Sequence, residues 1–137
     1  MTGTDGRSPG ARVVALDYGS ARCGVAVSDP TGTLATPLDV VVRPNTRKGF
    51  NRLLAAIRAQ DPARVVVGLP LSLSGGDSAQ TTEARAFAER LGTMLGLPVE
   101  LYDERFTTTL AQRRPGAAAE DSRAAAVLLE EWLATRR

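Results

Sequence analysis

Three stretches rich in apolar and β-branched residues open the patterned part of the chain, and turn residues separate them. The stretches cover residues 12–17, 22–28 and 33–42, with the turn segments 18–21 and 29–32 between them. Short apolar runs bounded by Gly, Ser, Asp and Pro predict β-strands. Because the turns are short, we expect the three strands to pair antiparallel as a meander. Pro37 interrupts the third stretch and favours an edge position for it.

The pattern then changes to helices that alternate with strands. A start signal at residues 44–46 precedes apolar residues at helical spacing, and Asp61 and Pro62 end that helix. A continuous apolar run at 64–69 predicts a strand covered on both faces. The remaining predicted elements are a longer helix that Gly96 and Pro98 close, a strand at 99–103, a short helix at 107–114, a small-residue break at 115–119 and a last helix at 121–134.

This order predicts an α/β fold with a mixed five-stranded sheet. Three antiparallel strands come first, and parallel strand-helix-strand units follow, which places helices on the faces of the sheet. Residues 1–11 are mostly Gly, Ser, Pro and polar residues and predict a disordered tail. Residues 12–137 are then a single domain, large enough for a hydrophobic core.

Composition narrows the class of protein. No apolar run approaches the roughly 20 residues of a membrane span, and the single cysteine, Cys23, indicates a reducing compartment, so we expect a cytoplasmic protein. The formal net charge is only +2, but one stretch is locally basic. Such a patch can bind a phosphate backbone, or it can be a solvated helix face beside a basic loop. It contains Arg43, Arg47, Lys48, Arg52, Arg58 and Arg64, with Asp61 as the one acid.

Three acids lie where apolar segments end or begin. Asp17 closes the first strand, Glu104 follows the fifth, and Asp121 opens the last helix. Functional groups gather at the carboxyl ends of strands in open α/β sheets, and carboxylates suit Mg²⁺ or Mn²⁺. Each acid also has a purely structural explanation. Asp17 can shape a turn, Glu104 can form an ion pair at the surface, and Asp121 can be favoured by the helix dipole at the start of its helix. Asp103 is nearly as good a candidate as Glu104, and strand alternation puts the two on opposite faces.

The face of the last helix supports Asp121. Residues 121, 124, 125, 128, 129 and 132 share one helical face, and all but Asp121 are apolar. An ionised carboxylate in line with a core-packing face needs a partner such as a cation.

Other chemistries have weaker signals. The chain has no histidine, which excludes histidine-based catalysis, and Cys23 lies inside an apolar strand, which favours a core role. The Gly-rich segment 74–77 lacks the lysine of a P-loop.

Five segments together resemble the YqgF family, also called RuvX. They are LDYGSARCGVAVSD at 16–29, VVGLPLSL at 66–73 with Gly75, FAERL at 87–91, DERFTT at 103–108 and DSRAAAVLLEEWL at 121–133. Members of this family are described as Holliday-junction-resolvase-like proteins or as nucleases of precursor 16S rRNA. The resemblance implies an RNase H-like fold, in agreement with the predicted element order.

The resemblance also implies that Asp17, Glu104 and Asp121 are the catalytic acids that bind metal. Arg105 and Thr107 match motif positions as well, as residues that contact phosphate or orient Glu104. This chain departs from the family at Cys23, where a basic residue is usual. It also departs between Thr109 and Asp121, where a longer helix and a basic loop are usual and only Arg113 and Arg114 supply positive charge.

The hypothesis that follows is metal-assisted hydrolysis of phosphodiesters in structured nucleic acid. Two Mg²⁺ or Mn²⁺ ions would clamp the scissile phosphate, with Asp17 bridging both. A Holliday junction substrate requires a symmetric dimer, whereas a precursor rRNA requires recognition of shape or of a single-stranded end. Alternatives are a non-catalytic nucleic-acid-binding module and an actin-like nucleotide-binding lobe based on residues 17–20. The residues expected to bind nucleic acid are Arg22, Arg47, Lys48, Arg52, Arg105 and Thr107.

Overall fold

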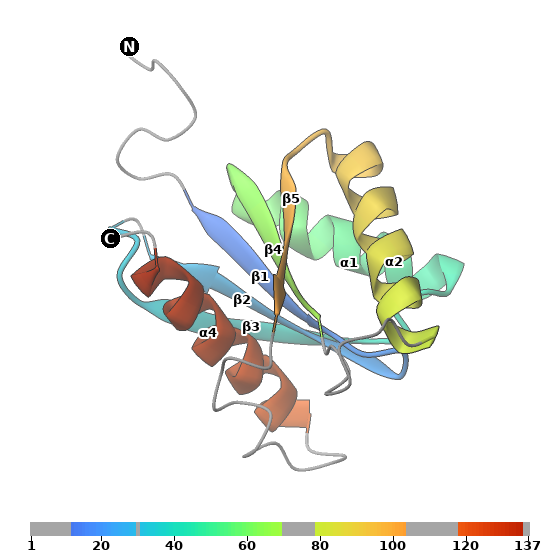
Figure 1. The fold of residues 1–137 in the computed structure, drawn as a ribbon, viewed down its shortest axis with the longest axis horizontal. Coiled ribbons are helices and arrows are strands. Elements are labelled where there is room, and N and C mark those ends of the chain that lie inside the picture. Colours follow the sequence, from blue (N-terminus) through green and yellow to red (C-terminus); the bar gives the residue numbers. More distant parts are fainter. Residues whose placement is uncertain (1–11, 30, 70–78, 104–117, 136–137) are drawn as a thin grey trace.

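The computed structural model describes residues 12–29, 31–69, 79–103 and 118–135. The predicted tail at 1–11 and the predicted helix at 107–114 lie outside these ranges. No helix among the described residues is both long and apolar enough to cross a membrane. The elements, shown in Figure 1, are β1 (Val13–Tyr18), β2 (Arg22–Ser28), β3 (Ala35–Val42), α1 (Arg47–Gln60), β4 (Arg64–Leu69), α2 (Ala79–Leu95), β5 (Val99–Asp103) and α4 (Ala118–Ala134).

All five strands form one mixed sheet in the order β3-β2-β1-β4-β5. β2 pairs antiparallel with both β1 and β3, whereas β4 pairs parallel with β1 and with β5. The predicted meander followed by parallel units is therefore confirmed. β1 lies at the centre of the sheet, which explains why its residues from Val14 onward are buried.

Successive residues of β1 point to opposite faces of the sheet, and each face is covered by helices (Figure 1). Val14, Leu16 and Tyr18 belong to a core with α1 and α2. Ala15 belongs to a second core with α4, and Val13 packs against it. By the same alternation Asp17 faces α4. The prediction of helices on both faces is confirmed.

The free edge of β3 is protected against pairing with another strand. The Ala35 amide donates to Glu130 Oε2 (3.3 Å), and the Val40 amide donates to Asp39 Oδ1 (2.7 Å). Pro37 has no amide hydrogen, and the register shifts beside it, where Val25 pairs with Asp39 and Ala26 with Pro37. Occupied amides, proline and a bulge are the usual means of preventing edge-to-edge association. The edge position predicted from Pro37 is confirmed.

The first helix begins and ends where the sequence indicates. Thr46 caps α1 by accepting a hydrogen bond from the Gly49 amide (3.1 Å), and Asp61 ends it in a left-handed conformation. A side chain at Gly49 would meet the Arg43 carbonyl oxygen at 2.0 Å, so only glycine fits this turn.

Several predicted boundaries were wrong by one to three residues. β1 runs one residue later than predicted, and β3 begins at Ala35 rather than at residue 33. The last helix begins at Ala118 rather than at Asp121, so the predicted break at 115–119 is wrong for its final two residues. Alanine has the highest helix propensity, which explains why these residues extend the helix.

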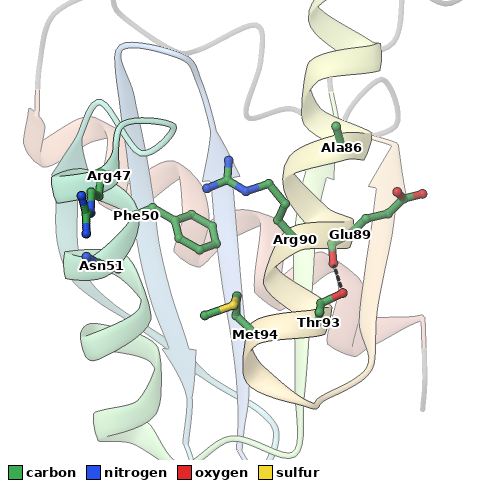
Figure 2. A pocket seen from close by; sticks show the side chains of 8 residues that line it. All are labelled: Arg47, Phe50, Asn51, Ala86, Glu89, Arg90, Thr93 and Met94. Atoms are coloured by element: carbon green, nitrogen blue, oxygen red, sulfur yellow. Dashed lines mark hydrogen bonds between the residues drawn. The ribbon is translucent and has the colours of Figure 1, made fainter.

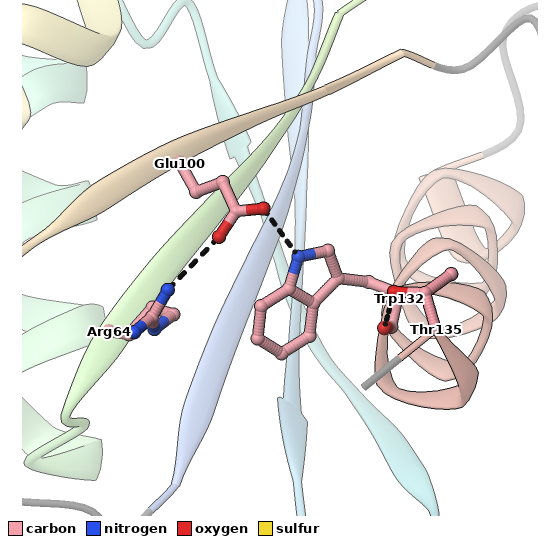
Figure 3. Close-up of polar contacts among 4 residues, drawn as sticks. All are labelled: Arg64, Glu100, Trp132 and Thr135. Carbon is pink, nitrogen blue, oxygen red and sulfur yellow. Dashed lines mark hydrogen bonds and ion pairs between the residues drawn. The ribbon is translucent and has the colours of Figure 1, made fainter. Parts of the chain in front are cut away.

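The carboxyl-terminal part of α4 is fixed to the sheet by a polar cluster (Figure 3). Glu100 accepts hydrogen bonds from Trp132 Nε1 and from Arg64 Nη1, both at 3.0 Å, and the Arg64 guanidinium lies 5.8 Å from the centre of the Trp132 ring. Arg64 and Glu100 lie near the starts of β4 and β5. The last turns of α4 therefore lie over the amino ends of these strands, and its first turn lies toward their carboxyl ends (Figure 1).

Trp132→Phe should lower the free energy of unfolding by about 1 kcal/mol, because the ring still packs while Glu100 loses a hydrogen-bond donor. Leu128→Ala, in the same buried helix face, should cost about 2–5 kcal/mol through the cavity that it leaves. Urea unfolding of the two variants measures both values. Equal losses would show that Trp132 acts through apolar packing alone.

Candidate functional site

The candidate site centres on Asp17, the penultimate residue of β1. Its side chain is 4% exposed and lies on the α4 face, at the carboxyl end of a central strand that pairs with β4 in parallel. Asp17 takes part in interactions within the protein. A carboxylate this deeply placed requires polar or cationic partners, because burial of an unpaired charge costs several kcal/mol.

The residues beside Asp17 in the sheet are glycines on both sides. Asp17 pairs with Gly24 of β2 and with Gly68 of β4. Side chains at paired positions lie about 5 Å apart, so these two glycines leave space around the carboxylate where any other residue would fill it. Farther out in the same row, Val40 follows Gly24 on one side and Tyr102 follows Gly68 on the other. In this row of the sheet, the Asp17 carboxylate thus has no side chain beside it on either neighbouring strand.

Arg22 and the first turn of α4 lie at the same end of the sheet. Arg22 is half-buried and shares a sheet face with Gly24, two residues closer to the end of the sheet. Asp121 lies in α4 about 16 Å along the helix axis from Trp132, in the direction of the carboxyl end of β1. The backbone of Asp121 is therefore at the end of the helix where the prediction requires it, and its side chain lies outside the described part of the structure.

The rest of the predicted acid cluster is not described. Glu104, Arg105 and Thr107 lie outside the described residues. Within the part of the chain that the structure describes, no group of three Asp, Glu, His or Cys side chains could hold a metal ion. The described part of the candidate site is therefore Asp17, its two glycine neighbours, Arg22 and the start of α4.

A hydrogen-bond network holds the next residue, Tyr18, on the opposite face of the sheet. The Tyr18 hydroxyl donates to Glu83 Oε2 (2.5 Å) and accepts from Asn45 Nδ2 (2.6 Å), and Asn45 Nδ2 also donates to Glu83 (3.0 Å). The Tyr18 ring packs on Phe87, with ring centres 4.3 Å apart. The end of β1 is thereby joined to the residues before α1 and to α2, which fixes the backbone next to Asp17.

Burial of the Tyr18 phenol, together with its hydrogen bond and proximity to the Glu83 carboxylate, raises the pKa of Tyr18 well above its usual value near 10. The neutral phenol is thus the form that this network holds.

Glu83, Asn45 and the two glycines were not among the site residues predicted from the sequence. A signal for Gly24 and Gly68 was available, because glycine inside an otherwise apolar strand indicates that another group approaches the backbone closely. No local signal could have paired Tyr18 with Glu83, which is far away in sequence.

The structure divides the basic patch predicted at residues 43–64. Arg64 does not belong to it, because its side chain pairs with Glu100 and lies by Trp132 on the α4 face. Arg58 donates to the Met94 carbonyl oxygen (3.0 Å) near the end of α1. Arg47, Lys48 and Arg52 are exposed on α1, which covers the face opposite Asp17, and Arg52 lies 3.9 Å from Asp39. The structure therefore places Arg64 away from Arg47, Lys48 and Arg52, on the other face of the sheet. Cys23, for which the sequence favoured a core role, is fully buried.

Comparison with known proteins decides the family. Residues 11–135 match the family model described as RuvX, Holliday junction resolvase. The chain belongs to the RuvX family. A relative from Clavibacter michiganensis named "Putative pre-16S rRNA nuclease" is 42% identical and the match covers 90% of this chain and 83% of the relative. A relative of the same name from Anaeromyxobacter is 40% identical, with 89% and 96% covered, and one from Koribacter versatilis is 46% identical, with 74% and 67% covered.

Solved structures agree with the fold of this RuvX-family chain. RuvC of Thermus thermophilus in complex with a Holliday junction substrate superposes with a TM-score of 0.58 at 16% identity, covering 92% of this chain and 95% of RuvC. Free RuvC from the same organism gives 0.57. The RNase H-like fold predicted from the resemblance is confirmed.

Tyr18→Phe should remove a pH dependence of stability. The native state holds the Tyr18 proton above pH 10, where the unfolded chain releases it, so the free energy of unfolding falls as the pH rises through 10. The phenylalanine variant keeps the ring contact and lacks this titration. At pH 8 it should be less stable by about 1–2 kcal/mol, and the difference should shrink above pH 10. Urea unfolding at both pH values measures this, and a difference that does not change with pH would contradict the assignment.

Proposed function

We propose that the chain is a metal-dependent nuclease that hydrolyses phosphodiesters of structured nucleic acid, with Asp17 as the central metal-binding carboxylate. The observation that carries the proposal is the placement of Asp17 between Gly24 and Gly68, at the carboxyl end of the central strand of an RNase H-like sheet. A carboxylate with no side chain beside it on either neighbouring strand can be approached by a cation and a phosphate that such side chains would exclude.

Two further acids complete the proposed set of ligands. The position of its backbone in the first turn of α4 supports Asp121. Later residues on the same face of this helix, such as Ala125 and Leu128, are buried against the sheet. Glu104 is favoured over Asp103 by the alternation along β5. Tyr102 packs against the α4 core and Leu101 against the α1–α2 core. A strand that kept this alternation for two more residues would direct Glu104 to the face of Asp17, and for this reason we propose Glu104 rather than Asp103.

These residues fit Mg²⁺ or Mn²⁺. The donor set is three carboxylates without histidine or cysteine, which suits hard divalent cations. Three ionised carboxylates on one face would repel each other strongly without bound positive charge. When two such ions are bound, they lower the pKa of an attacking water and stabilise the leaving oxygen. The protein's own part is to hold Asp17 rigidly between two strands, to exclude other side chains through its glycines and to place Arg22 beside the site as a cation for the phosphate.

The proposed substrate is a precursor rRNA end, as the names of the curated relatives suggest. The second candidate is a Holliday junction, which the name of the family model and the fold shared with RuvC suggest. Symmetric cleavage of a junction needs two active sites and therefore a C2 dimer. The protected edge of β3 argues against a dimer formed by pairing of that edge.

Asp17→Asn should abolish cleavage, to below about one thousandth of the wild-type rate, because a charge that would hold the metal is lost. Parallel assays would use an end-labelled four-way DNA junction and a 5′-extended rRNA precursor, each with Mn²⁺ and with EDTA. Paired nicks in the junction would favour the resolvase, and defined shortening of the RNA would favour the maturation nuclease. Wild-type-like cleavage by a folded Asp17→Asn protein would overturn the proposal, and metal binding without any cleavage would favour a non-catalytic binding module.

Gly24→Ala should lower kcat/KM by about ten- to a hundredfold, because the added methyl group occupies space beside Asp17. Gly92→Ala is the matched control, since its new methyl group would lie in α2 at an ordinary 3.5 Å from the Val99 side chain. Thermal unfolding would show that both variants are folded. Equal activity of the two variants would mean that the space beside Asp17 is not used.

A further inference from the structure

A groove of about 680 Å³ lies between α1 and α2, on the face of the sheet opposite Asp17 (Figure 2). Arg47 and Phe50 line it from α1, and Ala86, Glu89, Arg90 and Met94 line it from α2. In Figure 2 the side chains of Arg90 and Met94 extend from α2 toward Phe50. The function proposed for Asp17 makes no use of this groove.

Arg90 is held in a fixed orientation at the surface of the groove. Its Nη1 donates to Asn45 Oδ1 (3.0 Å), and its guanidinium lies 4.1 Å from the centre of the Phe50 ring. Phe50 is itself packed edge-on against Phe87, with ring centres 5.8 Å apart. A guanidinium that lies on an aromatic ring keeps its other face and most of its five donors available to a ligand. Because the side chain is already held in place, less conformational entropy is lost when the ligand binds.

The charge around the groove is mainly positive. Within the described residues neither Arg47 nor Arg90 has an ion-pair partner, and α1 contains no acidic residue. Lys48 adds a further exposed cation next to Arg47. Among the described residues that line the groove, Glu89 is the one acid. The groove therefore suits a ligand that combines negative charge with a flat apolar body.

The groove and Asp17 lie at the same end of the sheet. Asn45 joins them, because it accepts from Arg90 and donates to Tyr18, the residue after Asp17. β3 ends at Val42, and α1 begins shortly afterwards at Arg47. Val42 pairs with Arg22 of β2, whose side chain lies on the face of Asp17. A chain that leaves the site of Asp17 can thus pass around this end of the sheet and reach Arg47.

We propose that the groove between α1 and α2 binds a single-stranded segment of the nucleic acid substrate. A base stacks on the open face of Arg90, and a phosphate binds Arg47; this assignment rests on the nuclease function proposed above. An acidic amphipathic helix is the less suitable occupant, because such helices insert several apolar anchors, and Met94 is the one large apolar side chain exposed among the described residues that line the groove. Guanidinium and aromatic platforms bind single strands with little sequence preference.

Fluorescence anisotropy of labelled oligo-U and oligo-dT of about eight nucleotides, in EDTA, tests the proposal without cleavage. Arg90→Gln should raise Kd about tenfold or more, and Arg90→Lys should not restore binding, because an ammonium group cannot provide the stacking plane. Arg85→Gln is the matched control: it makes the same change of charge on the same helix, at an exposed residue that lies beside Val99 and Leu101 of β5 rather than in the groove. It should change Kd by less than about twofold.

Three results would overturn the proposal: unchanged binding by folded Arg90→Gln, an equal loss in Arg85→Gln, or binding of an acidic helical peptide in place of the oligonucleotides. A second assay separates this proposal from the nuclease assignment. Cleavage with Mn²⁺ is compared on substrates with and without a single-stranded flank. The wild-type protein should cut the flanked substrate faster, and Arg90→Gln should cut both substrates at the rate of the unflanked one. If Arg90→Gln still cuts the flanked substrate faster, the proposed role of the groove is wrong and the nuclease assignment stands. A wild-type protein that binds oligonucleotides and cuts neither substrate would overturn the nuclease alone.

Discussion

The structure depends on a charged residue in the central strand of a sheet that is covered on both faces. β1 contributes Val14, Leu16 and Tyr18 to one core and Ala15 to the other, and Asp17 is the one acidic residue of this buried strand. The protein accommodates this carboxylate by placing glycine on both neighbouring strands. Each of these glycines weakens its strand, since glycine is unfavourable in strand interiors.

Asp17 and Tyr18, which are adjacent in β1, make different contacts on the two faces of the sheet. Asp17 faces α4, which is fixed at its far end by Trp132, Glu100 and Arg64 and begins near the carboxyl end of β1. Tyr18 faces α1 and α2 and is fixed there by Glu83 and Asn45. Adjacent residues of one strand thereby connect the proposed catalytic centre to the groove that we propose for single-stranded nucleic acid. Because a strand alternates sides at every residue, both connections require only β1 to be rigid.

Much of the candidate site could be predicted from local sequence, and some of it could not. Asp17 was identified because it ends an apolar strand, and Asp121 because it continues the apolar face of a helix. Gly24 and Gly68 lie 44 positions apart in sequence, and only strand pairing shows that both adjoin Asp17. The basic residues illustrate the reverse case. Arg64 follows the cations of α1 closely in sequence, yet it points to the opposite face of the sheet and pairs with Glu100.

The sequence by itself determined the order of the elements, the antiparallel and parallel pairing, the edge position of β3 and the family, because these follow from periodicity, turn residues and motifs that neighbouring residues carry. Only the tertiary structure decided which residues lie beside Asp17, which side chains hold Tyr18 and which cations share a surface. The physical reason is that hydrophobic periodicity specifies which face of an element is buried, but not which element covers it. Contacts between distant segments arise from the register of strands and the packing of helices, and no local pattern encodes them.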